Sequence, residues 1–176
     1  GGFARITESD PDSWERTLRT NGVGPYLATR LCAPAMREAG RGWIIHVGSA
    51  SGLSEPGDRS TDYVLSKVAL NFLVNAEYAV HRSSGRERRV IVRTRDTAHH
   101  FVRFEVEDSG PGVTPADEAK LFAPFFTTKP VGEGTGLGLS VSWGIIHSHG
   151  GCIGYERGTM GGARFFFEIP AASTTP

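Results

Sequence analysis

Four polar residues recur at every fourth position within residues 62–80, a stretch that contains no Gly or Pro. They are Tyr63, Lys67, Asn71 and Asn75, and the apolar residues between them recur at roughly helical spacing. Since four residues make slightly more than one helical turn, a helix would place all four on one slowly rotating stripe. The Tyr and Lys can hold a phenol beside an ammonium for proton transfer. The two Asn residues can hold magnesium and phosphate oxygens.

Asp108 is a second candidate, because it ends a segment in which apolar and charged residues alternate. The segment covers residues 101–108, and the alternation places Asp108 on the same side as the apolar residues. A carboxylate that points inward is costly without a partner, so Asp108 is a candidate to accept a specific hydrogen bond. The turn Gly110-Pro111-Gly112 follows and lets backbone pass close to a ligand.

A glycine-rich loop over residues 132–140 is the third candidate. It reads GEGTGLGLS and leads into a stretch of helical character over residues 139–148. The amides of such a loop and the N-terminus of the helix can bind phosphate. The apolar segment Leu121–Phe126 and then Thr127, Thr128 and Lys129 precede the loop. The sequence therefore predicts an anion site in this part of the chain.

The first part of the chain is expected to be mostly helical. Residues 12–38 are compatible with a helix, and Gly22, Gly24 and Pro25 predict a kink or break within it. A short apolar run of buried-strand type follows at Trp43–Val47, before a polar loop that ends near residue 61. The apolar residues expected near one face of the helix are Trp14, Leu18, Val23, Leu27, Leu31 and Met36.

The second half of the chain mixes strands and helices. Residues 89–95 and 101–108 both alternate, so we expect a hairpin whose outer face exchanges Arg and Glu contacts. The arginines there are expected to be a solvated sheet face and not a nucleic-acid patch. The elements expected after the hairpin are a short helix from Thr114 and Pro115, a helix over 139–148, and strands at about 152–157 and 163–169.

The composition argues against several classes of protein. The chain has 176 residues with 19 Lys and Arg against 19 Asp and Glu, a balance that disfavours general attraction to nucleic acid or anionic membrane. No run of about eighteen apolar residues occurs, so no membrane segment is expected. The N-terminus lacks the features of a signal peptide. Cys32 and Cys152 have no metal-ligand spacing, so we expect a cytoplasmic protein with two reduced, buried or half-buried thiols.

The order of the motifs after residue 70 resembles the catalytic ATP-binding domain of sensor histidine kinases, in the Bergerat-fold ATPase superfamily. The resemblance covers residues 70–170 and implies an α/β fold, a two-layer sandwich. It implies that Asn75 binds the Mg that bridges the phosphates, with Asn71 beside it, and that Asp108 accepts from the adenine amino group. Lys129 could reach a phosphate. The other residues implied to contact ATP are Gly110 and Gly112 at the base, Phe125, Phe126 and Thr128 in the lid segment, and Gly134, Thr135, Gly136, Leu137 and Gly138 around the triphosphate.

The first seventy residues resemble an internal fragment of a short-chain dehydrogenase/reductase, a family of Rossmann-like fold. Tyr63 and Lys67 lie within YVLSK, Ser49 within IIHVGSASG and Asn21 within RTNGVG. The resemblance implies that Tyr63 is the acid/base and that Lys67 stabilises its anion and contacts the nicotinamide ribose. It implies further that Ser49 polarises the carbonyl and that Asn21 holds a relay water. The Gly-rich turn that receives the cofactor pyrophosphate is missing, so we expect these four residues to be an idle remnant.

We therefore expect a dehydrogenase-like fragment at 1–69, an ATPase domain at 70–170 and a disordered tail at 171–176. The expected function is ATP and Mg binding, with phosphoryl transfer to a histidine supplied by another domain or chain, because none of the six histidines lies in an acidic phosphoacceptor helix. A response regulator is the implied partner. Two alternatives stay open: an NAD(P)-dependent oxidoreductase, and a chimeric scaffold without activity. We also expect Trp43–Val47 to take a vacant edge of the ATPase sheet.

Overall fold

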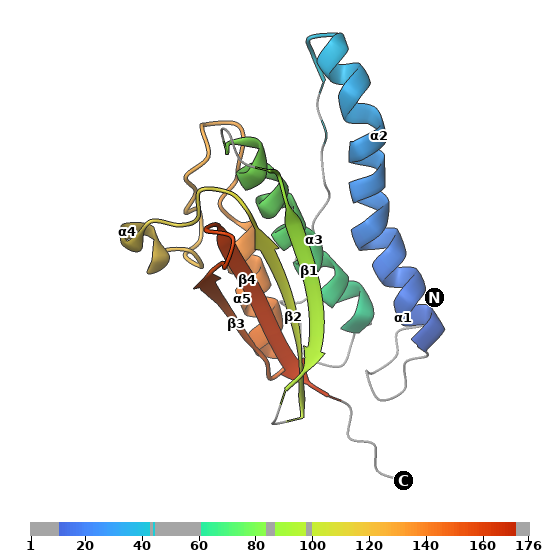
Figure 1. Cartoon of the computed structure of the whole chain (residues 1–176). Coiled ribbons are helices and arrows are strands. Elements are labelled where there is room, and N and C mark those ends of the chain that lie inside the picture. Colours follow the sequence, from blue (N-terminus) through green and yellow to red (C-terminus); the bar gives the residue numbers. More distant parts are fainter. Residues whose placement is uncertain (1–10, 43, 45–60, 84–86, 98–99, 172–176) are drawn as a thin grey trace.

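A four-stranded sheet with helices on one face forms the body of the protein (Figure 1). The computed structural model describes residues 11–42, 44, 61–83, 87–97 and 100–171. The helices are α1 (Pro11–Leu18), α2 (Gly24–Glu38), α3 (Thr61–His81), α4 (Pro115–Glu118) and α5 (Gly138–Ser148), and a π-helical turn η2 (Arg19–Val23) joins α1 to α2. The strands are β1 (Val90–Asp96), β2 (Phe101–Asp108), β3 (Cys152–Arg157) and β4 (Ala163–Pro170).

The strands form one antiparallel sheet in the order β1-β2-β4-β3. Strands β1 and β2 form the predicted hairpin, with Val92 opposite Val106, and Phe104 of β2 lies opposite Phe167 of β4. Helices α3 and α5 cover one face of this sheet (Figure 1). The predicted two-layer α/β sandwich is therefore confirmed, and the helix predicted over 62–80 is α3 with one more residue at each end.

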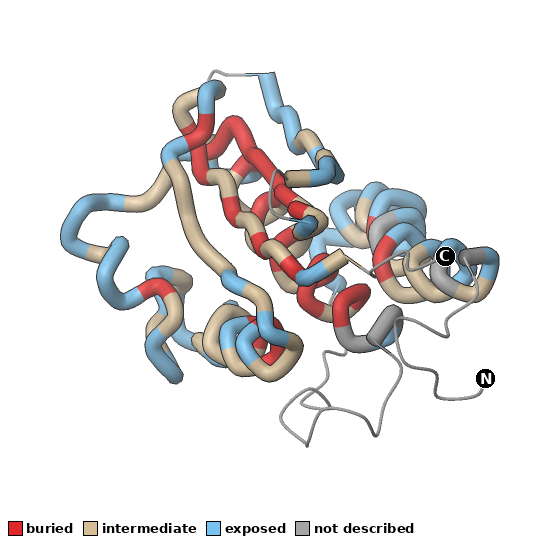
Figure 2. Tube along the Cα trace, turned by 90° about the horizontal axis from the view of Figure 1, so that it is seen from below, coloured by how far each residue is buried: buried red, intermediate tan, exposed pale blue. Residues whose placement is uncertain are grey.

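The hydrophobic core lies between α3, α5 and the sheet, where the buried residues gather (Figure 2). Phe72 of α3 is fully buried, and its ring centroid lies 5.7 Å from that of Phe165 and 6.1 Å from that of Phe167 on β4. Ile145 and Ile146 close the core from α5. The apolar residues of α3 thus fix its polar stripe relative to the sheet.

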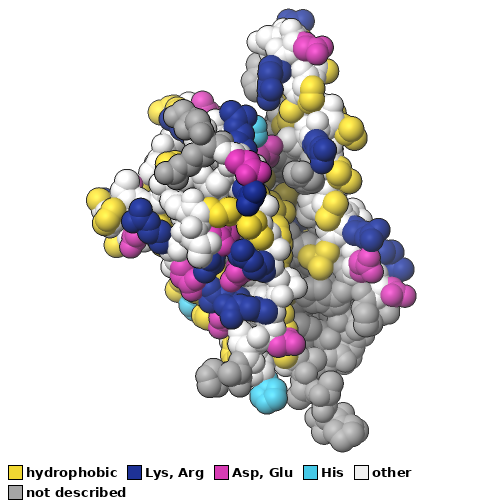
Figure 3. Space-filling view, viewed as in Figure 1, with side chains coloured by type: hydrophobic (Ala, Val, Ile, Leu, Met, Phe, Trp, Pro, Cys, Tyr) yellow, Lys and Arg dark blue, Asp and Glu magenta, His cyan; other side chains and the backbone are white. Residues whose placement is uncertain are grey.

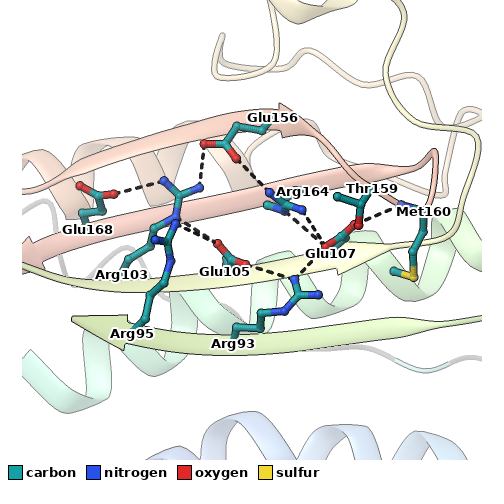
Figure 4. A network of polar contacts seen from close by, with 10 residues as sticks. All are labelled: Arg93, Arg95, Arg103, Glu105, Glu107, Glu156, Thr159, Met160, Arg164 and Glu168. Atoms are coloured by element: carbon teal, nitrogen blue, oxygen red, sulfur yellow. Dashed lines mark hydrogen bonds and ion pairs between the residues drawn. The ribbon is translucent and has the colours of Figure 1, made fainter. Parts of the chain in front are cut away.

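The other face of the sheet carries a network of arginines and glutamates (Figure 4). Figure 3 shows the positive and negative side chains interleaved over the strands. The Arg and Glu contacts between β1 and β2 are confirmed, because Arg93 lies 3.1 Å from Glu105 and 2.7 Å from Glu107. The prediction that this face is solvated is wrong for β2, where Arg103, Glu105 and Glu107 are buried. Strand β2 is central, so long side chains from the strands on both sides lie across its charges and exclude water.

The N-terminal helices leave several of their apolar residues uncovered. The interruption expected near Gly22 and Gly24 is confirmed as η2. However, Val23, Leu27 and Leu31 are 48, 47 and 77% exposed, so they do not form a buried face. The C-terminal half of α2, which includes Leu31, stands clear of the sheet and of α3 (Figure 1), and hydrophobic side chains line its open side (Figure 3).

Both cysteines are free and exposed, so the prediction of buried or half-buried thiols is wrong. Cys32 lies on α2, which is exposed along most of its length, and Cys152 begins the edge strand β3. Among the described helices, none is both long and apolar enough to cross a membrane.

Several predictions fall on residues outside the described part of the chain. These are the role of Ser49, most of the strand at Trp43–Val47, and the tail after Ala171. Ile44 is the one described residue of that predicted strand, and it is exposed and lies in none of the described strands.

Candidate functional site

Helix α3 turns the Asn71 and Asn75 end of its polar stripe toward α5 and the loop before it. The Asn71 side-chain amide donates to the Gly138 carbonyl at 3.2 Å and to the Ser142 hydroxyl at 3.0 Å, at the start of α5. One turn later, Asn75 Oδ1 accepts a hydrogen bond from Lys129 Nζ at 3.1 Å. The structure thus brings together Asn71, Asn75, Lys129 and Gly138, which lie far apart in the sequence.

Asp108 lies at the end of β2, buried and 2% exposed, as the alternation of that strand predicts. Its Oδ1 accepts from the backbone amides of Gly110 at 2.8 Å and Ala163 at 3.3 Å. Burial raises the pKa of Asp108, and these two amides offset only part of that rise. Among the described residues the Asp108 hydrogen bonds all go to Oδ1, so Oδ2 can accept from a ligand.

Three glycines bring the chain close to Asp108. A Cβ at Gly110 would lie 2.7 Å from the Ala79 side chain, which places this turn against α3 one turn beyond Asn75. A side chain at Gly162 would collide with the backbone and carboxylate of Asp108. Gly112 has a positive φ of 77° and lies against the Gly161 carbonyl. Gly162 is absent from the predicted site; its one sequence signal is the Gly161-Gly162 pair before the last strand.

The loop before α5 folds back on itself. Gly136 has a positive φ of 68°, and a side chain there would collide with the backbone of Phe125. A Cβ at Gly134 would lie 3.0 Å from both the Lys129 side chain and the Thr127 hydroxyl. Gly136 therefore requires glycine for a steric reason, whereas at Gly134 the close neighbours are side-chain atoms. Of the remaining predicted lid and loop residues, Phe126 packs against the core, whereas Phe125, Thr128, Thr135 and Leu137 are exposed.

Lys129 is the cation of this group. Its Nζ lies 4.4 Å from the centre of the Tyr78 ring as well as beside Asn75. Burial lowers the pKa of Lys129, and the negative charge of Glu133 opposes that shift. Tyr78 in turn donates its hydroxyl hydrogen to Glu133 at 3.1 Å. Tyr78 and Glu133 are missing from the predicted site, although Tyr78 follows Asn75 by three residues and so shares its side of α3.

The oxygen ligands of this site suit a magnesium ion that binds together with a nucleotide. In the described part of the chain, no group of three or more His, Cys, Asp or Glu side chains could hold a metal. Asn75 Oδ1 supplies one oxygen, and Mg commonly takes its remaining ligands from phosphates and water. The residues thus suit a metal held mainly by a triphosphate and not by a protein cage.

The Tyr63 and Lys67 end of the stripe is arranged differently. The Asn21 side-chain amide donates to the Ser66 hydroxyl at 3.1 Å, and that hydroxyl donates to the Tyr63 carbonyl at 2.6 Å. Lys67 Nζ lies 5.4 Å from the centre of the Tyr63 ring. Asn21 lies in η2 and Ser66 lies in α3, so their hydrogen bond connects these two elements. Ser66 is fully buried at this connection.

Asn21→Ala is expected to lower the free energy of unfolding by about 1 kcal/mol, the usual net value of a hydrogen bond. Chemical denaturation measures this, with Thr20→Ala as the control on an exposed neighbour in the same turn. The control is expected to change stability by less than about 0.5 kcal/mol. Equal stability of Asn21→Ala and the wild type would contradict a structural role for Asn21.

Comparisons with known families agree with the two halves seen in the sequence. The model of histidine kinase-, DNA gyrase B-, and HSP90-like ATPases matches residues 62–173, and that of short chain dehydrogenases matches residues 1–85. The two matches overlap over residues 62–85, which contain nearly all of α3. This helix is therefore common to both similarities.

Several curated relatives are sensor kinases. The chain is 40% identical to the sensor histidine kinase ZraS of Klebsiella oxytoca over 106 residues, which cover 60% of this chain and 22% of ZraS. It is 42% identical to the sensor kinase CckA of Brucella abortus over 119 residues, which cover 59% of this chain and 12% of CckA. The chain thus spans about a fifth or less of the length of these relatives.

Solved structures extend the same similarity to the fold. The nucleotide-free catalytic domain of the histidine kinase ThkA matches with a TM-score of 0.57 and 27% identity, over 89% of this chain and 91% of that domain. Full-length ShkA in complex with AMPPNP matches with a TM-score of 0.51 and 34% identity, over 64% of this chain and 22% of ShkA. The chain belongs to the family of histidine kinase-, DNA gyrase B- and HSP90-like ATPases.

Proposed function

We propose that the chain binds ATP with Mg and transfers its terminal phosphoryl group to a histidine supplied by another domain or chain. One observation carries the proposal. Asn75 on helix α3 accepts a hydrogen bond from Lys129, and one turn later Ala79 on the same helix contacts Gly110 in the turn that follows Asp108. A cation and an amide for phosphates therefore lie near a buried acceptor for a base. The similarity to ShkA, solved with the ATP analogue AMPPNP, supports this choice of ligand.

Each of these residues has a distinct task in the proposed reaction. Asp108 accepts a hydrogen bond from the adenine amino group, and its burial makes that bond selective because a mismatched base leaves the acceptor unpaired. Asn75 offers an oxygen to Mg, which when bound neutralises phosphate charge. Lys129 places a second positive charge on the phosphates, and the glycine loop offers backbone amides. These residues position the phosphates and neutralise their negative charge, which is most of what a protein contributes to phosphoryl transfer.

The phosphoacceptor is proposed to come from elsewhere because the described histidines beside α5 are engaged locally. His147 Nδ1 contacts the Trp143 carbonyl at 2.9 Å, and His149 Nδ1 contacts the Ile145 carbonyl at 2.8 Å. Both lie at the C-terminal end of a helix, where a positive charge is favourable. A response regulator as the final acceptor and a cytoplasmic location, where ATP is available, belong to the same proposal.

Titration with a fluorescent ATP analogue tests this function. The wild type is expected to bind more tightly with Mg than without it, and Asn75→Ala is expected to lose about tenfold in affinity only when Mg is present. The Mg-free titration serves as the internal control for correct folding of the variant. NADH and NADPH, titrated in parallel, are expected not to bind. Nicotinamide binding without ATP binding would support an oxidoreductase instead, and no binding of either would support an inactive scaffold.

A further inference from the structure

The Tyr78 side chain contacts both the cation and the glycine loop of the proposed site. It lies on α3, three residues after Asn75, and is partly buried. Its ring lies below the Lys129 ammonium, and its hydroxyl donates to Glu133 in the loop. Through these two contacts Tyr78 joins the cation to the loop, a role that neither the sequence motifs nor the family match assign to it.

The Tyr78 hydroxyl has a defined direction because it is bonded on two sides. Arg82 Nη1, one turn further along α3, donates to the Tyr78 oxygen at 3.0 Å. An oxygen that accepts from one side directs its own hydrogen elsewhere, and here the acceptor is Glu133 Oε2 at 3.1 Å. Arg82 thereby orients the hydroxyl, and the hydroxyl fastens the loop to α3.

The Tyr78 ring offers Lys129 a second favourable position. Lys129 Nζ lies 3.1 Å from Asn75 Oδ1 and 4.4 Å from the ring centre. A divalent cation at the same Asn75 oxygen would repel the ammonium, since like charges at such short distance are unfavourable. The ring face and the nearby Glu133 carboxylate still attract Lys129 when that oxygen is taken.

We propose that Tyr78 is a positioning residue of the nucleotide site: its ring keeps Lys129 beside the phosphates when a metal occupies Asn75, and its hydroxyl fastens the glycine loop through Glu133. This inference rests on the proposed function for its ligand. The fastening of the loop by the Tyr78 hydroxyl does not depend on a bound nucleotide, so it is tested separately.

The first measurement is hydrogen exchange without nucleotide. The Glu133 amide bonds to the Pro130 carbonyl at 3.0 Å, so its exchange rate reports how often the loop opens. Tyr78→Phe keeps the ring and removes the hydroxyl, and is expected to speed this exchange about fivefold, the effect of one lost hydrogen bond. Tyr155→Phe is the matched control, because Tyr155 lies on β3 and packs against Phe165, and it is expected to leave the rate unchanged.

The second measurement compares the affinities for ATP and AMP in the presence of Mg. Tyr78→Leu removes the ring and is expected to lower the ATP-to-AMP affinity ratio about fivefold, whereas Tyr78→Phe is expected to change it less than about twofold. Unchanged exchange at Glu133 in Tyr78→Phe, or an unchanged ratio in Tyr78→Leu, would overturn the inference. A wild type that binds neither nucleotide would instead contradict the proposed function, and exchange at Glu133 would then decide the role of Tyr78 alone.

Discussion

Asp108→Asn is expected to weaken ATP binding about 100-fold, the largest effect on binding that the structure predicts. The substitution keeps the shape of the side chain but replaces one acceptor oxygen by a donor. Because Oδ1 serves the Gly110 and Ala163 amides, the asparagine oxygen takes that place and its NH₂ group faces the ligand. Two donors then oppose each other in a buried site, which costs a few kcal/mol.

The same substitution is expected not to lower stability. The pKa of Asp108 is raised in the folded protein, so its contribution to stability is present in full at low pH and is lost as the pH rises through the folded value. At neutral pH the buried carboxylate therefore opposes folding, and Asn removes that charge. Calorimetric titration with ATP and thermal unfolding give the two quantities, with Asp96→Asn on exposed β1 as the control. Unchanged affinity would contradict the assignment of Asp108 to the base.

Glu107→Gln is expected to lower the free energy of unfolding at neutral pH by about 3 kcal/mol. Burial alone would raise the pKa of Glu107, but hydrogen bonds from Thr159, Arg93, Arg164 and the Met160 amide outweigh it and lower the pKa from 4.5 to about 2. Each unit of that difference corresponds to about 1.4 kcal/mol of stability. Glu107 is fully buried, whereas the side chain of its partner Arg93 is 40% exposed, so about 3 kcal/mol is the expected loss without solvent screening.

The effect of Glu107→Gln has a defined pH window. Since the folded pKa is the lower one, the stabilisation is present above about pH 4.5 and is lost as the pH falls toward about 2. The difference between the wild type and Glu107→Gln in urea denaturation is expected to shrink across this window. Glu87→Gln is the matched control, because its ion pair with Arg89 is exposed and is worth at most about 1 kcal/mol. Equal losses in both variants would contradict a special role for the buried network.

The pattern of β2 shows what alternation can predict and where it fails. Alternation alone places Asp108 on the side of the core, and the structure confirms this. It also places Arg103 and Glu107 on the opposite side, but it does not say whether water reaches that side. The answer depends on which strands flank β2, and the order β1-β2-β4-β3 arises from pairings between distant segments.

The sequence predicts those residues of the candidate site whose role can be read from a single motif. Asn75 and Lys129 are both present in motifs, but their contact joins residues 54 apart in the sequence. Tyr78, Glu133 and Gly162 become visible only once the loop and the last hairpin lie against α3 and Asp108. For helix α2 the sequence pattern predicts a face of apolar residues, but it does not show whether another element covers that face.

Helix α3 connects the two family similarities, and its polar stripe is divided between them. Asn71 and Asn75 keep partners in the loop and in α5, whereas the Tyr63 end is joined to η2 through Ser66 and Asn21. A boundary near residue 70, between a dehydrogenase-like fragment and the ATPase domain, remains a prediction. It would fall inside a continuous helix, since α3 runs without interruption through this position.

A crystal structure of the chain with Mg and a non-hydrolysable ATP analogue tests the central claim most directly. We expect an adenine amino group within hydrogen-bond distance of Asp108, a metal bound to Asn75 Oδ1, and Lys129 turned from that oxygen toward the phosphates. An analogue bound elsewhere on the protein, with the Lys129 to Asn75 hydrogen bond unchanged, would contradict it.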